Sequence, residues 1–547
     1  MSEQRSFQGY HTERFRTPNN PSKQKELLGE LREEEGLRVF RGHDGESYLR
    51  SIEQYQSSEL VEGFQYVLEI AELIRAQEGR ALLVGGSVRD EVLGMPSKDF
   101  DIEVYGIPLD QLKDLLESKG RVEIVGQSFG VLLFTTPGGF NLDVSIPRKD
   151  SKVGKSHKDF SIDPDPTMSI LEAARRRDFT FNALAKDPLT GEIFDGFGGI
   201  DDLKHRVLRA TDKELFADDP LRVLRAAQFI ARFGLRSEPE TLELIRSTVP
   251  SMDALSQDRF GTEWSKLLLK AVRPSAGLHA LHEFGVIERF YPELLALHDT
   301  QQEFEWHPEG DVWTHTLMVV DEASRVARRH ELEGARHRYL MYAALCHDLG
   351  KPSTTKHEDG RWRSKAHEPA GEEPTRSLLS RLGVKKDEIE VIVNLVKEHL
   401  WPGAMYRSFL KGEPVTEGAY RRIARRLAPA TIEDLTYVME ADAGGRGPFL
   451  HPDQPDQLLL PFPDQAGAWV RERARAFGID REKPQPVLQG RDLILLGLRP
   501  GKIFSAIISL ADKLRDEGMS REQILWRLEG STDAQEALRR LTHENSS

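Results

Sequence analysis

The sequence contains little cysteine and no long hydrophobic run, and each shortage excludes a class of protein. Its single cysteine, Cys346, cannot form a disulfide within the chain, and the first residues lack the apolar stretch of a signal peptide. No segment approaches the roughly 18 to 20 consecutive apolar residues of a membrane-spanning helix. We therefore expect a soluble protein of a reducing compartment, the cytoplasm, with no part inserted in a membrane.

Positive charge is also in short supply. The 75 Lys and Arg residues are outnumbered by 89 Asp and Glu residues, which gives a formal net charge of −14. Such a chain does not hold nucleic acid through a bulk positive field, so RNA contact would need confined arginine-rich surfaces and would be sensitive to salt. At 547 residues the chain is long enough for several domains, whereas the sequence does not predict its oligomeric state.

The periodicity of apolar residues changes along the chain and predicts an α+β fold. Residues 1–50 interleave acids and bases without a regular period, which is typical of a charged tail. From residue 51 a helical pattern precedes short Val-, Ile-, Leu- and Phe-rich runs bounded by glycine, the pattern of a small mixed sheet. After Met168 amphipathic helices dominate. Proline and glycine clusters near 444–457 and 481–490 predict a boundary before a C-terminal helical piece.

A glycine-rich turn within VGGSVRDEVLG is suited to binding a phosphate. Val84 ends a strand pattern, and Gly85 and Gly86 allow a tight turn. Ser87 is positioned to cap a helix that begins at Val88. The free backbone N–H groups at such a helix start can bind a phosphate without a cationic side chain. Taken alone, a turn of this kind is more often a plain strand-to-helix connection.

Aspartates after this turn have the spacing of metal ligands. Strand alternation in KDFDIEVYG puts Asp99 and Asp101 on one face and Phe100 on the other, toward the core. Two adjacent carboxylates repel each other unless a cation lies between them, and Mg²⁺ prefers oxygen ligands together with substrate phosphates. A pair of solvent-exposed acids is the alternative, but it leaves the glycine turn unexplained. Asp143, on a later strand, is the candidate third carboxylate, or else an ordinary edge acid.

Together the turn and the carboxylates predict magnesium-dependent nucleotidyl transfer. Asp99, Asp101 and Asp143 would be catalytic, with the metal held by the first two. The reaction would be an in-line attack of a 3′-hydroxyl on the α-phosphate of a nucleoside triphosphate, assisted by two metal ions, with pyrophosphate leaving.

Several motifs in this region resemble one known family. GGSVRDEVLG followed by DFD, then RRRDFTFNALAKD at 175–187, FGGIDDL at 197–203 and DDPLRVLRAAQFIARFG at 218–234, are similar to the class II tRNA nucleotidyltransferases and poly(A) polymerases. The resemblance covers residues 80–290 and implies tRNA, CTP and ATP as partners. It also assigns nucleotide binding to ten positions. These are Gly85, Gly86, Ser87, Arg89, Arg177, Asp178, Asn182, Asp219, Arg222 and Arg225.

Asp219 and Arg222 match the motif that in this family selects the incoming base without a nucleic-acid template. On a helix they lie at i and i+3, hence on one face. The carboxylate would accept from the exocyclic amine that cytosine and adenine share, and the guanidinium would donate to the neighbouring ring acceptor. The motif begins Asp218-Asp219 where the family usually has Glu-Asp, which leaves open whether C, A or both are added. A long polar stretch, 148–167, falls where the family has a flexible loop thought to govern the final A, so we favour complete CCA addition.

A second set of motifs lies between residues 300 and 450. WHPEGDVWTHTLMVVDEASR, YAALCHDLGKP, HEPAGEE and MEADAGGRG resemble the metal-dependent HD phosphohydrolase domain, as fused to the nucleotidyltransferase in some bacterial CCA-adding proteins. The resemblance implies that His315, the adjacent His347 and Asp348, and Asp442 hold a divalent metal, Mg²⁺, Mn²⁺ or Ni²⁺. The implied activity is hydrolysis of phosphomonoesters or 2′,3′-cyclic phosphates, which suits repair of a damaged tRNA end.

Two details of this second site remain open in the sequence. His367 would either add a ligand or face the substrate, and Asp434 competes with Asp442 for the last ligand position. Adjacent His and Asp side chains point about 100° apart on an ideal helix, so we expect a helix to end at this pair. The Gly-Lys-Pro that follows favours such an end.

The domains expected from these patterns are a tail, a head, a neck, an HD body and a C-terminal piece. Their ranges are 1–50, 51–200 (nucleotidyltransferase head), 201–295 (helical neck that selects nucleotides and binds RNA), 296–450 and 451–547. Four arginines in YRRIARRL form one helical stripe that could follow an RNA backbone, although a solvated helix face explains them nearly as well. They are Arg421, Arg422, Arg425 and Arg426.

Three functions are compatible with the sequence. The first is CCA addition to tRNA combined with an HD repair activity. The second keeps the same head but makes the protein a CC-adding enzyme, an A-adding enzyme or a poly(A) polymerase. The third, from a different class, is an RNA-binding scaffold or a protein that is mainly a phosphohydrolase. The aspartates of DFD argue against a pure scaffold.

Overall fold

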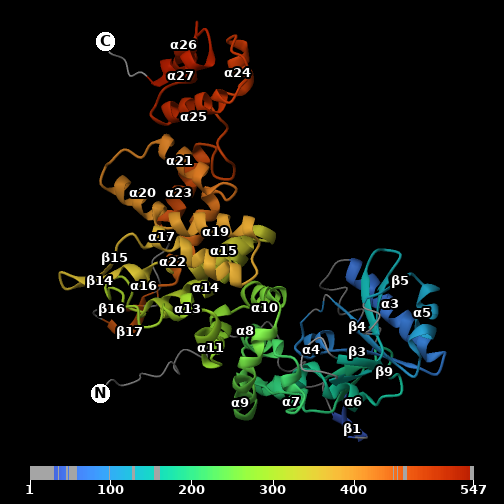
Figure 1. The fold of residues 1–547 in the computed structure, drawn as a ribbon. Coiled ribbons are helices and arrows are strands. Elements are labelled where there is room, and N and C mark those ends of the chain that lie inside the picture. The colour runs from blue at the N-terminus through green and yellow to red at the C-terminus, as the bar shows by residue number, and fades with distance from the viewer. Residues whose placement is uncertain are drawn as a thin grey trace. The chain divides into compact units, whose positions relative to one another are not determined.

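The chain folds into two compact units, whose elements are labelled in Figure 1. The first comprises the chain up to Ala226 together with Phe233–Leu255, and the second comprises Ala227–Arg232 together with the chain from Ser256. The computed structural model describes residues 30–34, 36–44, 47–48, 58–95, 97, 99–125, 130–152, 160–446, 449–451, 454–459 and 465–542. None of the helices in these ranges is both long and apolar enough to cross a membrane.

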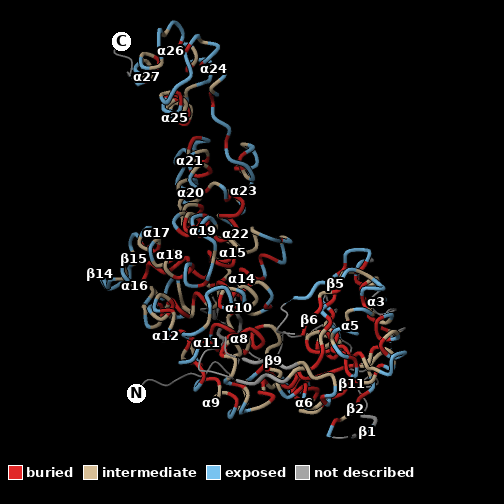
Figure 2. Tube along the Cα trace, turned by 45° about the vertical axis from the view of Figure 1, so that its right-hand side comes forward, coloured by how far each residue is buried: buried red, intermediate tan, exposed pale blue. Residues whose placement is uncertain are grey.

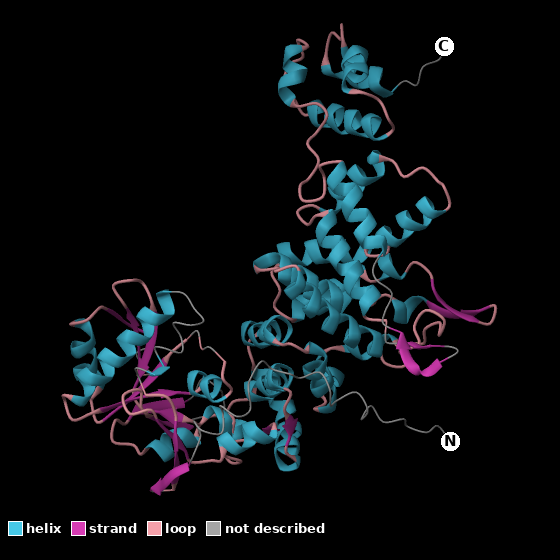
Figure 3. Ribbon diagram, turned by 180° about the vertical axis from the view of Figure 1, so that it is seen from behind, coloured by secondary structure: helices cyan, strands magenta, loops and turns pink. Residues whose placement is uncertain are grey.

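The first unit is built on a nine-stranded mixed sheet, magenta in Figure 3, with the strand order β1-β2-β11-β10-β3-β4-β7-β6-β5. Strands β4 and β7 are parallel, and the other neighbouring pairs of this sheet are antiparallel. The strands are β1 (Glu30–Glu34), β2 (Leu37–Arg41), β3 (Arg80–Val84), β4 (Asp101–Tyr105), β5 (Arg121–Ile124), β6 (Val131–Thr135), β7 (Asn141–Ser145), β10 (Ala185–Lys186) and β11 (Glu192–Asp195). The predicted mixed sheet is therefore confirmed, with more strands than the sequence pattern indicated.

Strands β1 and β2 correct one expectation. Residues 1–50 were expected to form a charged tail, but Leu37–Arg41 pairs with β11 and extends the sheet. Val39 and Phe40 of β2 are buried although charged residues surround them in the sequence. Alternating charges hid this short strand, because its register is set by a partner that lies about 150 residues later in the chain.

Helices and short strands complete the first unit. They are α3 (Ser58–Arg75), α4 (Gly86–Val92), α5 (Leu109–Glu117), β8 (Arg148–Lys152), β9 (Phe160–Pro164), α6 (Ile170–Arg175), η2 (Thr180–Asn182), α7 (Gly199–His205), β12 (Val207–Leu208), η3 (Phe216–Asp218), β13 (Arg236–Ser237), α9 (Pro239–Thr248) and η4 (Val249–Ala254). Helix α3 packs on the sheet through Phe64, whose ring centroid lies 5.4 Å from that of Phe100. Phe100 is buried, as its position between two aspartates predicted.

The polar stretch 148–167, expected to be a flexible loop, contains the antiparallel strands β8 and β9. The part of this stretch at 153–159 lies outside the described residues. Helix α8 (Leu221–Phe233) follows the 3-10 turn η3, and its residues are shared between the two units.

The second unit is mostly helical, which confirms the predicted helical body. Its elements up to residue 459 are α10 (Gln257–Lys270), α11 (Pro274–Glu283), α12 (Val286–Phe290), α13 (Pro292–Leu295), α14 (Val312–Arg329), α15 (Gly334–Cys346), α16 (Lys351–Thr354), β14 (Thr355–Glu358), β15 (Arg361–Ser364), α17 (His367–Ala370), α18 (Glu372–Arg381), α19 (Lys386–Glu398), α20 (Trp401–Leu410), α21 (Glu417–Leu427), α22 (Ile432–Gly444), β16 (Phe449–His451) and β17 (Gln454–Leu459). Helix α14 packs against both α15 and α22.

The C-terminal part of this unit has a hydrophobic cluster of its own. It contains α23 (Gln465–Ala476), α24 (Gly490–Leu495), α25 (Ile503–Asp516), α26 (Arg521–Leu528) and α27 (Ala534–Thr542). Leu493, Phe504, Ile507, Ile524 and Leu528 are buried against one another. In Figure 2 the group of α24, α25, α26 and α27 shows red stretches of buried residues among pale blue exposed ones.

Candidate functional sites

The glycine turn joins β3 to α4. Gly85 has φ 71°, which a residue with a side chain rarely adopts, and it stands at the N-cap of α4. The helix begins at Gly86, and no side chain caps it. The predicted cap at Ser87 is therefore wrong: Ser87 lies inside the first turn, where its hydroxyl donates to the Val84 carbonyl at 3.4 Å. The backbone N–H groups at this helix start therefore have no side-chain cap as hydrogen-bond acceptor.

Two aspartates lie side by side on neighbouring parallel strands. Asp101 begins β4, and its register partner on β7 is Asp143. Asp99 precedes the strand and is exposed, so it shares the neighbourhood without being part of β4. Burial raises the pKa of Asp101; the charge of Arg177 opposes this, and the charges of Asp143 and Asp99 add to the rise. The three carboxylates therefore repel one another, which is the arrangement that a divalent cation relieves.

The glycine turn and the carboxylates face the same space. A Cβ built on Gly85 would lie 3.7 Å from Arg177 Nη1 and 4.0 Å from Asp101 Oδ2. Arg177 is held by Glu103, a buried residue of β4, at 3.4 Å. The Tyr105 hydroxyl donates to the other oxygen of Glu103 at 2.8 Å. Sequence reasoning missed Glu103, although it is the second acid of β4, two positions after Asp101.

A chain of polar contacts links four further predicted residues. Arg89 Nη1 donates to Asn182 Oδ1 at 2.8 Å, Asn182 donates to Asp178 Oδ1 at 2.9 Å, and Arg225 Nε donates to Asp178 Oδ2 at 2.6 Å. Although burial alone would raise the pKa of Asp178, Arg225 and Asn182 lower it. Asp178 is thus a buried, charged carboxylate that ties η2 to α8. Arg225, expected to bind the nucleotide, donates to Asp178 in this conformation.

The proposed base-reading pair differs from the expected geometry. Asp219 is not on a helix: its backbone is extended, and its Oδ1 accepts the N–H of Leu221 at 3.2 Å just before α8 begins. Arg222 is in the first turn of α8 and donates to the carbonyls of Leu215 at 2.7 Å and Arg176 at 2.5 Å. Asp219 therefore acts as a local cap of the helix that carries Arg222. Asp219 and Arg222 were expected at i and i+3 on one helix face, but Asp219 lies before the helix and only Arg222 lies within it.

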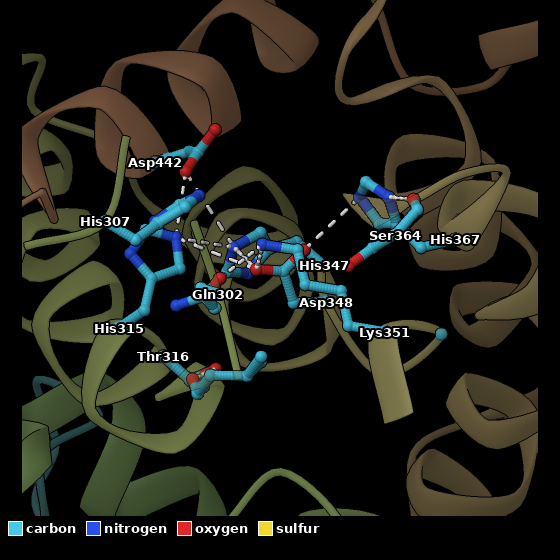
Figure 4. Close-up of polar contacts among 12 residues, drawn as sticks. Gln302, His307, His315, Thr316, His347, Asp348, Lys351, Ser364, His367 and Asp442 are labelled. Atoms are coloured by element: carbon cyan, nitrogen blue, oxygen red, sulfur yellow. Dashed lines mark hydrogen bonds and ion pairs between the residues drawn. The ribbon is translucent and has the colours of Figure 1, made fainter. Parts of the chain in front are cut away.

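The second site is formed by three helices of the second unit. His315 lies on α14, Asp442 lies on α22, and α15 ends at Cys346, directly before His347 and Asp348. The helix end predicted at the His-Asp pair is thus present. The four predicted ligands are buried, and Figure 4 shows their polar atoms pointing toward one another.

Their distances are those of a compact cluster. His315 Nε2 lies 3.0 Å from Asp442 Oδ1 and 3.3 Å from His347 Nε2, and His347 Nε2 lies 3.1 Å from Asp348 Oδ2. Asp434 is elsewhere: it completes the capping box of α22 with Thr431 and pairs with Arg336 at 2.7 Å. The geometry therefore places Asp442, and not Asp434, beside the histidines.

Three histidines at this site make the same kind of hydrogen bond to the backbone. The Nδ1 atoms of His347, His367 and His399 donate to the backbone carbonyls of residues 344, 364 and 396, at 2.8, 2.8 and 2.6 Å. A carbonyl can only accept, so each neutral ring keeps the lone pair of Nε2 for the site. Sequence reasoning missed His399, because this residue lies in KEHLW, outside the recognised motifs.

These histidines create a second ligand group next to the first. Asp348, His367 and His399 have ligand atoms within 4.8 Å of one another, as do His315, His347 and Asp442. His367 Nε2 is buried, has no hydrogen-bond partner among the described residues and lies 3.4 Å from Asp348 Oδ1. Burial and the neighbouring histidines lower the pKa of His399 to about 3, so its ring is neutral.

An acidic residue supports the first ligand group from outside. Glu309 Oε1 lies 2.7 Å from His315 Nδ1 and 2.9 Å from His307 Nδ1. Although burial opposes it, contact with both rings lowers the pKa of Glu309 to about 2. A carboxylate that orients a histidine ligand is a common outer contact of metal sites. Glu309 and His307 lie in WHPEGD, just ahead of His315. Of the longer motif WHPEGDVWTHTLMVVDEASR, only His315 was singled out from the sequence.

Two cations lie among these acids. Lys351 Nζ is 2.7 Å from Asp348 Oδ2 and donates to Gln302 Oε1 at 2.7 Å. Arg446 Nη2 lies 3.4 Å from Asp442 Oδ2. Although burial alone would raise it, His347 and nearby cations hold the pKa of Asp348 well below its ordinary value. The site thus combines imidazole nitrogens, carboxylates, the buried cation of Lys351 and the half-buried cation of Arg446, which together suit a metal ion and an anionic substrate.

The expected arginine stripe on α21 is corrected by the structure. Arg421 and Arg425 pair with Asp516 at the end of α25, and Arg426 pairs with Glu398 at 2.6 Å. Arg422 is exposed on the same helix. Because Arg421 and Arg425 hold α25 against α21, the four side chains do not form one free surface for RNA.

Comparison with known proteins accounts for both sites together. A family described as "Poly A polymerase head domain" matches residues 81–209, one described as "Probable RNA and SrmB- binding site of polymerase A" matches 234–297, and "HD domain" matches 312–443. The chain is 38% identical to the multifunctional CCA protein of Xanthomonas campestris pv. campestris over 370 residues, which are 66% of this chain and 85% of the relative. This chain belongs to the multifunctional CCA protein family.

A second relative supports this assignment, and solved structures show a similar fold. The multifunctional CCA protein of Stenotrophomonas maltophilia is 36% identical over 398 residues, 72% of this chain and 92% of that protein. The CCA-adding enzyme of Bacillus stearothermophilus in complex with CTP has a TM-score of 0.55 at 19% identity, over 85% of this chain and 94% of that one. The Thermotoga maritima CCA-adding enzyme complexed with tRNA has a TM-score of 0.52 at 19% identity, over 91% and 99%. At this identity the structures show that this chain shares their fold.

Proposed function

We propose that this chain adds C, C and A to the 3′ end of tRNA from CTP and ATP, without a nucleic-acid template. We further propose that its HD domain hydrolyses phosphomonoesters or 2′,3′-cyclic phosphates at damaged 3′ ends before the end is rebuilt. The observation that carries the first proposal is the convergence of Gly85, Arg177, Asp101 and Asp143 in a member of the multifunctional CCA protein family. A cytoplasmic location, where tRNA and reduced cysteine coexist, accompanies this proposal.

The head residues divide the work of nucleotidyl transfer. The three carboxylates Asp99, Asp101 and Asp143 offer oxygen ligands that fit Mg²⁺, and the repulsion acting on Asp101 supports a cation there. Mg²⁺ at this position supplies charge that neutralises the triphosphate. The N–H groups at the start of α4 and the guanidinium of Arg177 bind phosphate oxygens and align the α-phosphate with the 3′-hydroxyl.

Base selection rests on Asp219 and Arg222 in this proposal. The Asp219 carboxylate accepts from the amine of cytosine or adenine, and Arg222 donates to the adjacent ring nitrogen. Guanine and uracil present a carbonyl to the carboxylate and a ring N–H to the guanidinium, so both contacts are repulsive. Arg222 donates to two main-chain carbonyls in the structure, and because a guanidinium has five N–H donors it can keep both bonds while it reads a base.

The donor set of the HD site fits divalent transition metals. Imidazole Nε2 atoms and carboxylates converge in the buried interior, and the Nε2 atom of His367 has no hydrogen-bond partner among the described residues. We propose that the two ligand groups hold two ions that share the neighbourhood of Asp348. A divalent cation held there supplies Lewis-acid charge for phosphoester hydrolysis. Lys351 and Arg446, the cations beside the ligand carboxylates, bind the phosphoryl oxygens of the substrate and orient it.

The experiment that tests the transfer activity uses tRNA that lacks its 3′ CCA. Purified protein is incubated with this tRNA and with CTP and ATP, singly and together, and the products are sequenced. We expect C and C from CTP alone and the complete CCA from both nucleotides. Addition of CC only, of A only or of a long A tract would instead support the second candidate function, and absence of any extension would reject a transferase.

A further inference from the structure

Two segments that begin at the HD site carry exposed aromatic side chains. Residues 302–307 start at Gln302, which accepts from Lys351, and end at His307, whose ring centroid lies 4.6 Å from that of His315. The hairpin of β14 and β15 starts directly after α16 and ends three residues before His367, whose Nδ1 donates to the Ser364 carbonyl. Both segments are therefore anchored on ligands or on contacts of ligands.

The two segments are also joined to each other. The N–H of Trp362, on β15, donates to Glu303 Oε2 at 3.0 Å, and Arg361 pairs with Glu305 at 3.1 Å. Asp359 and Gly360 both have positive φ and close the hairpin as a two-residue turn, which leaves the N–H of Trp362 on the outer edge of the strand. Residues 302–307 and the hairpin thus form one connected surface.

Large aromatic rings on this surface face solvent. Phe304 is 75% exposed, Trp306 is 57% exposed and Trp362 is 38% exposed. Exposed rings of this size forgo the stabilisation that burial would provide, of about 1.5 to 3 kcal/mol each. In Figure 2 the hairpin appears mostly in the colour of exposed residues. We call Phe304, Trp306, His357 and Trp362 the aromatic platform.

The strand register of the hairpin sets how far part of the platform lies from the metal ligands. Thr355 pairs with Ser364 and His357 pairs with Trp362, so these four residues share one face of the hairpin. The Thr355–Ser364 pair lies next to His367, and the His357–Trp362 pair lies two positions further out, about 7 Å along the strands. The rings of His357 and Trp362 are 4.9 Å apart. A base can therefore stack beside the site at roughly the distance of one nucleotide.

The charges of this surface decide what kind of partner suits it. The hairpin and the residue directly after it carry four cations, which are Lys356, Arg361, Arg363 and Lys365. The two segments carry an equal number of acids, which are Glu303, Glu305, Glu358 and Asp359. A surface without net charge does not attract an RNA backbone from a distance. Exposed aromatic rings instead recognise nucleobases by stacking, which accepts every base.

We propose that the aromatic platform binds the unpaired 3′-terminal bases of an RNA strand while its terminal phosphate lies in the HD site. The inference rests on the phosphohydrolase function proposed above and names its substrate: a single-stranded RNA end, in preference to a free phosphomonoester. Recognition by stacking explains why the rings stay exposed next to a site lined with histidines and carboxylates. It also makes binding at this surface only weakly dependent on salt.

The test compares substrates that differ only in their bases. One is a single-stranded oligoribonucleotide that ends in a 3′-phosphate or a 2′,3′-cyclic phosphate, and the other has the same backbone with abasic final nucleotides. We expect the full-length protein to hydrolyse the first with a kcat/KM about tenfold higher or more, mostly through KM. The double variant Trp306→Ala/Trp362→Ala should remove this difference and leave the abasic substrate unaffected. Trp526→Ala, which removes an exposed tryptophan ring on α26, is the control.

The outcomes separate the inference from the function on which it rests. Hydrolysis of neither substrate would reject the phosphohydrolase function itself. Equal hydrolysis of both substrates, unchanged in the double variant, would reject the platform while leaving that function intact. Loss of activity on both substrates in a folded double variant would also reject it, because the rings would then act on the site and not on bases.

A readout other than activity completes the test. An oligoribonucleotide with 4-thiouridine in its last position should crosslink to peptides 302–307 or 355–365, at a yield that changes little between low and moderate salt. Crosslinks confined to the first unit would overturn the proposal. A dimer of the wild-type protein that dissociates in the double variant, without any change in substrate preference, would also overturn it and make this surface a contact between two copies.

Discussion

At the scale of single residues, the buried carboxylate of Asp178 shows how a charge is kept in the interior. It accepts hydrogen bonds from the backbone N–H of the next residue, Phe179, at 2.8 Å, and from the side chains of Asn182 and Arg225. Burial raises the pKa of an isolated carboxyl, but here the cation and the amide more than compensate, and the pKa is lowered. The residue that the family resemblance assigns to nucleotide binding is therefore also a structural link between η2 and α8.

This link predicts a pH dependence with a definite sign. Because the folded pKa of Asp178 lies below its unfolded value of about 3.9, ionised Asp178 stabilises the head above about pH 4, and the contribution is lost as the pH falls through the folded pKa. Asp178→Asn, which leaves Arg225 without its anion, should cost about 2 to 4 kcal/mol at pH 7. It should also flatten the decline of the melting temperature on acidification.

Scanning calorimetry between pH 7 and pH 3 measures both effects. Asp114→Asn, at an exposed position on α5, is the control and should change neither. A wild-type curve as flat as that of Asp178→Asn would contradict the role of this carboxylate.

At the scale of elements, the site of the head is set by the way β3, α4, β4 and β7 meet. The parallel pairing of β4 with β7 brings Asp143 opposite Asp101 across 42 positions of sequence. The left-handed Gly85 lets the chain leave β3 and enter α4 beside these carboxylates. Neither feature depends on a single side chain, so the arrangement is a property of the strand order.

Gly85→Ala tests this arrangement. The alanine must adopt an unfavourable φ, which costs about 1 to 2 kcal/mol, and its methyl projects toward Arg177 Nη1 and Asp101 Oδ2. We expect the KM for CTP and for ATP to rise about tenfold because the methyl occupies space proposed for a phosphate. Steady-state kinetics of tRNA extension measure the change.

Gly139→Ala provides the comparison within the same unit. Gly139 has φ +92°, and a Cβ added there would have no atom within 4 Å, so the substitution strains the backbone without filling a site. Both variants should lower the melting temperature by similar amounts, whereas only Gly85→Ala should raise KM. Equal KM values in the two variants would show that the turn does not bind the nucleotide.

At the scale of the whole molecule, the two proposed sites lie in different compact units. Asp101 belongs to the first unit and Asp348 to the second. Their chemistry is also distinct, since one site offers only carboxylates and the other adds imidazoles. Each activity should therefore survive the loss of the other.

Two alanine substitutions test this independence. Asp101→Ala should abolish tRNA extension and retain phosphoester hydrolysis, and Asp348→Ala should do the reverse. Because Asp348 belongs to one ligand group and its Oδ2 lies 3.1 Å from His347 of the other, its removal should also lower the number of tightly bound metal ions, whereas His399→Ala should affect one ion only. Extension assays, hydrolysis assays and metal analysis of the same preparations give the answer. If either aspartate variant loses both activities while remaining folded, the division between the units is wrong.

Much of this could be predicted from the sequence. Alternation of apolar residues indicated most strands of the sheet, and the 3.6-residue period indicated the helices, because each pattern reflects burial on one local face. The motifs around Asp101 and His347 were recognisable because their spacing is set by a strand or a helix end. Strand β2 was missed because its burial depends on β11, and Ser87 was misjudged because a helix start can move by one or two residues without a side-chain cap.

The sequence by itself determined the α+β class, the position of the glycine turn and the identity of the main metal-ligand candidates. Only the tertiary structure decided which distant groups join them. It chose Asp442 over Asp434, added His399 and Glu309 to the HD site, and used Arg421 and Arg425 to hold α25. The physical reason is that a ligand cluster depends on distances between side chains from separate elements, and these distances follow from helix packing that no local pattern encodes.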